Sequence, residues 1–201
     1  MIYVSIDIET GGLIARDKNS KLIPQIIEFG AILDDLENPK PLEELPTFHC
    51  YFLWDHYTGD PYALQMHSKI FKRIAEEEEG YNYYYPHKFG YYFYDFLKQN
   101  GLEPTPSPEN KKALEKVYIN VAGKNFGTFD MVFLDEQTDL SKYVRMRHRF
   151  VDPGTMFMRK EDESVPSLEE CLKRAKMDSN VKHDAVSDAL DVVKLVRYKM
   201  T

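Results

Sequence analysis

Cysteine is scarce in this sequence. Its 201 residues include two cysteines, Cys50 and Cys171, which lie far apart in the chain. Two such cysteines cannot form the disulfide framework of a small secreted protein, and no C-x-x-C pair indicates a zinc site. A reduced, cytoplasmic setting is the simplest interpretation.

Long apolar runs and a surplus of positive charge are also missing. No apolar segment reaches membrane-spanning length, so we expect no membrane partner. The first residues lack the basic start and apolar core of a secretory signal. The net charge is −7, whereas proteins that coat DNA are usually basic. From charge alone we expect the protein to contact little of a nucleic-acid backbone, limited to a short segment at the end of a strand.

The composition suits one globular domain spanning residues 1–201, because 43% of the residues are hydrophobic. Runs rich in β-branched and aromatic residues predict early strands at 2–8, 25–33 and 48–54. We expect these three strands to form an antiparallel meander.

Strand and helix patterns alternate in the rest of the chain, which favours a mixed α/β fold. The expected elements are helices at 61–76, 87–97, 126–134, 167–176 and 185–200 and strands at 117–122 and 150–152. Asn125 and Ser167 are the candidate N-caps of the helices that follow them. Segment 81–97 holds seven tyrosines and three phenylalanines. Its aromatic rings could stack on bases, but core packing beneath a tyrosine-lined surface is the interpretation that we favour.

Asp7 and Glu9 are two residues apart on the first predicted strand. Side chains alternate along a strand, so both carboxylates project from the same face. Adjacent buried carboxylates repel unless a positive group binds between them, and Mg²⁺ or Mn²⁺ prefers oxygen ligands. A D-x-E pair is common, however, and a solvated strand face explains it equally well.

Three further residues gain meaning only in combination. Asp130 would lie one turn into the helix at 126–134, and His183 and Asp188 would lie at the start of the last helix. Taken singly, Asp130 could be an ordinary first-turn acid, and a histidine near a helix start is usually structural. Small alanines on the last helix would let it approach the sheet closely, so that Asp188 could meet Asp7 and Glu9.

The motifs DIET at 7–10, NFGTFD at 125–130 and HDAVSD at 183–188, in this order, resemble the DEDDh family of 3′–5′ exonucleases. This family is the DnaQ-like branch of the ribonuclease H-like fold. The resemblance extends from residue 2 to about residue 199. It fills every expected catalytic position, and the histidine five residues before the last aspartate marks the subtype. The catalytic residues that it implies are Asp7, Glu9, Asp130, His183 and Asp188.

The resemblance also implies a fold, a cofactor and a substrate. The expected sheet has three antiparallel strands followed by parallel ones and is flanked by helices. Two Mg²⁺ or Mn²⁺ ions would bind Asp7, Glu9, Asp130 and Asp188, with His183 as general base. The substrate would be the 3′ end of single-stranded DNA or RNA, and the products nucleoside 5′-monophosphates.

The family further implies substrate contacts. Thr10, Gly11 and Leu13 match the segment that cradles the terminal nucleotide, and Asn125 matches an asparagine that supports the site. Gly11 stands where threonine is common in the family, so a side chain near the terminal sugar is lost.

Other functions stay open at this point. The protein could be a non-catalytic nucleic-acid-binding module on the same fold, or a proofreading subunit that acts with a polymerase; a homo-oligomer is also open. His183-Asp184 could belong to another metal phosphohydrolase, but the remaining histidines lack the spacing that such a site needs. Six basic residues could guide a strand or simply form a solvated surface: Arg145, Arg147, Arg149, Lys173, Arg174 and Lys182.

Overall fold

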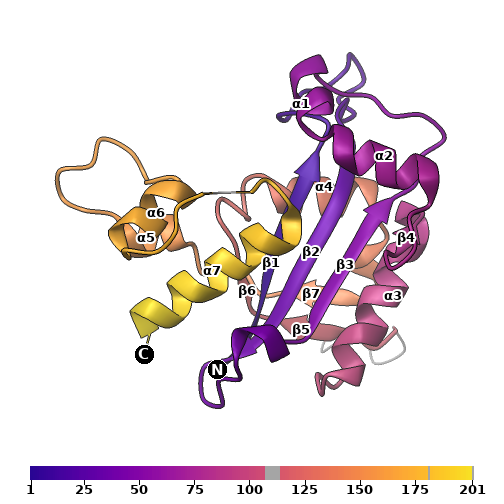
Figure 1. Cartoon of the computed structure of the whole chain (residues 1–201). Coiled ribbons are helices and arrows are strands. Elements are labelled where there is room, and N and C mark those ends of the chain that lie inside the picture. Colours follow the sequence, from indigo (N-terminus) through magenta and orange to yellow (C-terminus); the bar gives the residue numbers. More distant parts are fainter. Residues whose placement is uncertain (107–113, 181, 201) are drawn as a thin grey trace.

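The computed structural model describes residues 1–106, 114–180 and 182–200. In this part of the chain, the main sheet has five strands in the order β4-β3-β2-β1-β6 (Figure 1). The strands are β1 (Ile2–Thr10), β2 (Ile26–Asp35), β3 (Thr47–Phe52), β4 (Tyr83–Tyr84) and β6 (Val121–Ala122). β1, β2 and β3 are antiparallel, whereas β4 and β6 run parallel to β3 and β1. The predicted α/β fold with a mixed sheet is confirmed.

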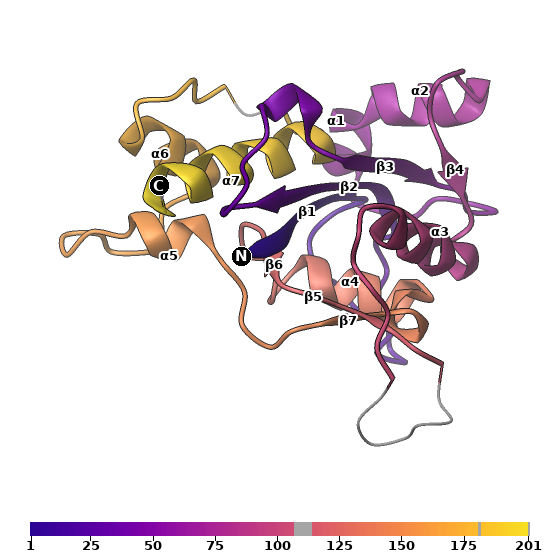
Figure 2. The ribbon, with the colours of Figure 1, turned by 90° about the horizontal axis from the view of Figure 1, so that it is seen from below.

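Helices cover both faces of this sheet. α7 (Ala185–Met200) lies on one face, with α5 (Pro153–Phe157) and α6 (Leu168–Arg174) beside it. α3 (Pro86–Gln99) and α4 (Asp130–Gln137) lie on the other face, as does a second sheet of two parallel strands (Figure 2). That second sheet consists of β5 (Val117–Ile119) and β7 (Val144–Met146). The remaining elements are α1 (Pro61–Met66), α2 (Ser68–Glu76) and the 3-10 turns Leu42–Glu44 and Leu140–Lys142.

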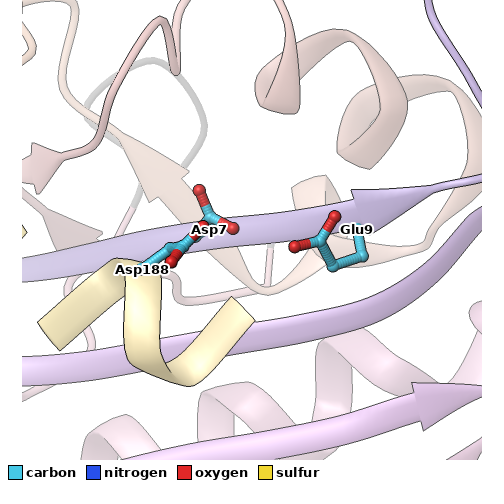
Figure 3. A group of neighbouring side chains, drawn as sticks. All are labelled: Asp7, Glu9 and Asp188. Atoms are coloured by element: carbon cyan, nitrogen blue, oxygen red, sulfur yellow. The ribbon is translucent and has the colours of Figure 1, made fainter. Parts of the chain in front are cut away.

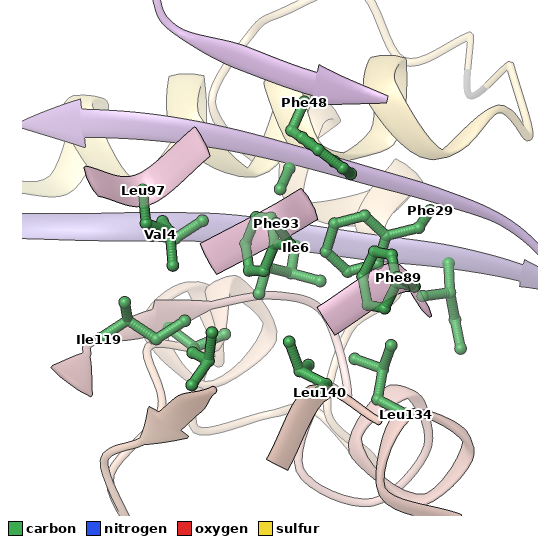
Figure 4. Close-up of a cluster of buried hydrophobic side chains, with 14 of the residues drawn as sticks. Val4, Ile6, Phe29, Phe48, Phe89, Phe93, Leu97, Ile119, Leu134 and Leu140 are labelled. Atoms are coloured by element: carbon green, nitrogen blue, oxygen red, sulfur yellow. The ribbon is translucent and has the colours of Figure 1, made fainter. Parts of the chain in front are cut away.

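The larger core lies between the sheet and α3 (Figure 4). Val4 and Ile6 of β1 point into it, together with Phe29 of β2. Phe89 and Phe93 are one turn apart on α3, are fully buried, and stack on each other. Alternation along β1 therefore sends its even-numbered residues into this core and its odd-numbered residues toward α7.

α7 approaches the sheet closely, as the small residues predict. The Ser5 hydroxyl donates a hydrogen bond of 2.8 Å to the Ala189 carbonyl. A Cβ at Gly30 would lie 2.5 Å from the carbonyl carbon of Ala185. Gly30 pairs with Asp7 across β1 and β2. The first turn of α7 is thus held directly over the end of β1 that carries the acidic residues.

Two predicted elements are divided. The helix expected at 61–76 is two helices, α1 and α2, because the backbone turns at the buried His67. The strand expected at 117–122 separates at Asn120 into β5 and β6, which belong to different sheets. The Asn120 amide donates to the Ile2 carbonyl at 2.9 Å. The apolar periodicity of the sequence reveals neither break, because at each break a side chain contacts β1, which is distant in the sequence.

The segment around Asp130 also differs from prediction. α4 begins at Asp130, so Asp130 is its first residue and does not lie one turn inside. Asn125 is not the N-cap; it has φ +58°, and its carbonyl accepts the amides of Thr128 and Phe129 in a separate turn. The reason is tertiary, because Asp152 accepts the Asn125 N–H at 3.0 Å.

The strand expected at 150–152 is a single bridge between Val151 and Ala122. β4, β7 and α5 were not predicted, because segments this short carry little periodic signal. Ser167 is the N-cap of α6, as predicted, and accepts the Glu170 N–H. Among the described residues, no helix has the length and apolar character that crossing a bilayer requires.

Candidate metal centre

Three carboxylates meet where the end of β1 lies beneath the first turns of α7 (Figure 3). Asp7 and Glu9 come from β1 and Asp188 from α7, and one oxygen of each lies within 4.8 Å of the others. Asp7 and Glu9 are half-buried, and Asp188 is buried. The expectation that residues about 180 positions apart in the chain share one point is confirmed for these three.

The position of Asp188 follows from how α7 begins. Asp184 accepts the Ser187 N–H through its side chain at 2.9 Å, which is an N-cap interaction. The Asp188 N–H then bonds to the Asp184 carbonyl at 3.0 Å, so Asp188 lies one turn into the helix. With Ala185 against Gly30, this places the Asp188 side chain beside Asp7 and Glu9.

The carboxylates at this site hold their protons unusually strongly. Burial, reinforced by Asp130 and Glu9, raises the pKa of Asp7 well above its usual range. Burial and the nearby Glu28 raise the pKa of Glu9 to about 9. The pKa of Asp188 is raised to about 7, mainly by burial and then by Asp184. A bound cation offsets both causes, because it stabilises buried negative charge and reduces the repulsion between carboxylates.

One oxygen at the site has no protein partner. Oδ1 of Asp188 is buried and accepts no hydrogen bond from any described residue. Buried polar atoms are nearly always satisfied, so an orphaned oxygen on a carboxylate that lies beside two others fits a cation-binding site. Oxygen ligands alone suit a hard divalent ion. Asp7, Glu9 and Asp188 can therefore hold a metal ion.

Asp130 lies next to this group without belonging to it. Its Oδ1 accepts the Ile8 N–H at 3.2 Å, which fixes it beside the β1 backbone between Asp7 and Glu9. Burial raises the pKa of Asp130 to about 8. Asp130 is the strongest electrostatic influence on Asp7 after burial. The structure therefore brings Asp130 close to Asp7 but outside the three-carboxylate group.

His183 is exposed, has φ +53°, and lies two residues before α7. It lines a pocket of about 870 Å³ together with Glu28, His49 and His67. The pKa of His67 is lowered mainly by burial, and His183 lowers it further. The predicted general base therefore lies in the same neighbourhood as the carboxylates.

Sequence reasoning missed two buried groups at this site. Nε2 of His67 lies 3.3 Å from Oε2 of Glu9. Glu28 of β2 contacts His49 at 2.7 Å and accepts the Ala185 N–H at 3.2 Å. A single acid inside the apolar run QIIEFGAIL was the available signal for Glu28, because a charge within a buried strand needs a partner.

The residues predicted to bind substrate do not all come together. Thr10 and Leu13 line a groove of about 760 Å³ that borders Glu9 and His67. The same groove has an apolar wall, and Leu13 is 81% exposed. The wall includes Ile14, Tyr62, Met66 and Phe129.

Gly11 and Asn125 occupy other surroundings. A Cβ at Gly11 would lie 2.6 Å from the Thr58 carbonyl oxygen, so glycine is required for two loops to cross. This close crossing explains why Gly11 carries no side chain. Asn125 lines a separate pocket with Lys124 and Ser167.

The chain matches no known protein-family model, and no curated protein is detectably similar to it. Its function must therefore be argued from the carboxylate group and its surroundings.

Proposed function

We propose that this protein is a metal-dependent 3′–5′ exonuclease of the DEDDh type. It would hydrolyse the last phosphodiester bond at the 3′ end of single-stranded DNA or RNA and release nucleoside 5′-monophosphates. The observation that carries this proposal is the Asp7–Glu9–Asp188 group with its orphaned Asp188 oxygen. The order of the antiparallel and parallel strands supports a ribonuclease H-like fold.

The acidic residues divide between two ion positions in this proposal. Asp7, Glu9 and Asp188 would hold one Mg²⁺ or Mn²⁺, and Asp7 with the neighbouring Asp130 would hold the second. Bound divalent ions acidify water and stabilise the charge that develops on a phosphate. The requirement for metal then follows from the raised pKa values of the carboxylates, because without a cation the site tends to stay protonated.

His183 would accept the proton of the attacking water. A histidine changes charge near neutrality, which suits a general base. Because His183 is exposed at the pocket, it would pass that proton on to solvent. His67 would orient Glu9, since it is buried against that carboxylate.

The apolar groove beside Glu9 would receive the terminal nucleotide. The exposed Tyr62 ring offers a flat face on which a base of any identity can stack, and the exposed Leu13 adds apolar contact. A groove of this kind selects for unpaired bases and carries no sequence preference. Whether DNA or RNA is preferred depends on contacts to the sugar, for which Gly11 provides no side chain.

Digestion of matched oligonucleotides tests the proposal. DNA and RNA strands labelled at either end are incubated with Mg²⁺, with Mn²⁺, or with EDTA. We expect 5′-labelled strands to shorten stepwise, 3′-labelled strands to release a labelled mononucleotide first, and EDTA to stop both. Binding without digestion in either metal would identify a non-catalytic binding module, and internal cleavage would reject the exonuclease assignment.

A further inference from the structure

Three arginines line one groove at the end of the two-stranded sheet. Arg145, Arg147 and Arg149 are all exposed and line a groove of about 420 Å³ with His148. Tyr118 and Asn120 of the neighbouring segment also line it, and both are half-buried. This local positive charge stands out in a chain whose net charge is −7.

The strand register explains why these side chains gather. Arg145 of β7 pairs with Tyr118 of β5, and the neighbouring pairs, Val117 with Val144 and Ile119 with Met146, face the core. The Arg147 N–H continues the ladder by donating to the Ile119 carbonyl at 2.9 Å. Arg145 therefore points outward beside Tyr118. The chain bends at His148 just after β7, and this bend brings Arg147 and Arg149 to the same groove.

These arginines lack the partners that others in the chain have. Four arginines form ion pairs with carboxylates: Arg16 with Glu136, Arg73 with Glu78, Arg174 with Asp162, and Arg197 with Asp34. Within residues 1–106, 114–180 and 182–200, no such pair involves Arg145, Arg147 or Arg149. The charge of Arg145 acts on the carboxyl group of Asp135 in α4. In the described part of the chain no carboxylate forms an ion pair with the three guanidinium groups, so they can bind an external anion.

The groove is separate from the metal centre. Asn120, at its edge, bonds to Ile2 at the beginning of β1, whereas Glu9 lies at the opposite end of that strand. β5 and β7 lie on the face of the main sheet opposite α7, which carries Asp188 (Figure 2). The seven residue-to-residue steps of extended strand from Ile2 to Glu9 span about 23 Å.

We propose that Arg145, Arg147, Arg149 and Tyr118 form a second binding surface for single-stranded nucleic acid, outside the metal centre. Guanidinium groups bind phosphates through paired hydrogen bonds, and three of them line this one groove within five residues of chain. The Tyr118 ring lies among them, where an unpaired base can stack on it. An acidic peptide would use the charges but has no use for the ring. The surface does not require the metal centre to be a nuclease.

Binding of fluorescein-labelled oligothymidylate, measured by anisotropy in EDTA over a series of salt concentrations, tests the surface without turnover. The variant carries Arg145→Ala, Arg147→Ala and Arg149→Ala together. We expect at least about a tenfold loss of affinity, and a fall of about 2 in the slope of log affinity against log salt, since each lost phosphate contact contributes about 0.7. Tyr118→Leu should weaken binding about tenfold with an unchanged slope, because it removes stacking only.

A matched control removes three exposed lysines elsewhere, through Lys88→Ala, Lys160→Ala and Lys176→Ala. This variant loses the same charge and should bind almost as the wild type does. Circular dichroism checks that each variant is folded. Equal weakening by the lysine variant, or wild-type binding by the arginine variant, would overturn the proposal. So would polyglutamate binding as tightly as oligothymidylate with no effect of Tyr118→Leu, which would indicate a surface for an acidic protein. Failure of hydrolysis leaves all these outcomes unchanged.

Discussion

Glu9 and Glu28 face each other across β1 and β2, and each contacts a different histidine. Glu9 lies against His67, whereas Glu28 contacts His49 and the first N–H of α7. Two carboxylates in this position repel, and Glu28 contributes to the raised pKa of Glu9. Glu28 thus does two things: it holds the start of α7, and it increases the need for a cation near Glu9.

The first prediction tests whether Glu28 holds the start of α7. Glu28→Ala leaves the buried Ala185 N–H without an acceptor, so the free energy of unfolding should fall by about 1–3 kcal/mol. Metal affinity should fall as well, because Asp188 lies on the helix that is released. Glu28→Gln keeps an acceptor oxygen and should retain most of the stability. Urea unfolding and calorimetric Mg²⁺ titration measure both quantities; equal stability of the alanine variant and the wild type would contradict this role.

The second prediction concerns the orphaned oxygen of Asp188. Asp188→Asn removes a charged side chain from the proposed metal site, so the increase in thermal stability on adding Mg²⁺ or Mn²⁺ should largely disappear, along with the proposed nuclease activity. Asp191→Asn is the matched control, since Asp191 lies three residues further along α7 and pairs with Lys194. This control should keep the metal response. Loss of the response in both variants would indicate damage to α7 and would not support a metal site.

The third prediction is a pH dependence of stability. The pKa of Glu9 is raised from 4.5 to about 9 and that of Asp188 from 3.8 to about 7. The folded state therefore binds more protons than the unfolded state over this range, and stability decreases as pH rises. In EDTA the melting temperature should fall between about pH 5 and pH 9, and Mg²⁺ should restore it most at high pH.

Glu9→Gln is the control for this effect, because it removes the group with the higher pKa. Its melting temperature in EDTA should change less between about pH 7 and pH 9 than that of the wild type. A wild-type melting temperature that rises steadily to pH 9 without metal would disprove the electrostatic argument.

The fourth prediction distinguishes the proposed general base, His183, from the proposed metal ligands. His183→Ala should lower kcat by at least about 10²-fold and leave the Mg²⁺-induced stabilisation intact, because the residue lies outside the carboxylate group. His87→Ala is the control, as that histidine is exposed at the start of α3. Unchanged turnover in His183→Ala would remove the histidine from the proposed mechanism. Loss of metal binding in the same variant would make it a ligand.

Local sequence patterns predicted much of the fold. The extents of β1, β2, β3 and α7 were predicted to within a few residues, because each has a long and regular apolar periodicity. His67 and Asn120 show where this reasoning stops. Each lies at a break within a continuous apolar pattern, and at each break a side chain contacts β1: His67 contacts Glu9, and Asn120 bonds to Ile2. The prediction that Asn125 is an N-cap was wrong for a similar reason, because Asp152, which is distant in the sequence, accepts the backbone N–H of Asn125.

By itself, the sequence determined that Asp7 and Glu9 share one face of a strand and that α7 is amphipathic with small residues toward the sheet. Both follow from the repeat of a single element. The sequence also predicted that Asp188 meets them, but only the tertiary structure decided that Glu28 and His67 lie beside the group and that three arginines line one groove with Tyr118. These relationships join segments far apart in the chain, and the packing of helix on sheet, not any local period, sets the distances between them.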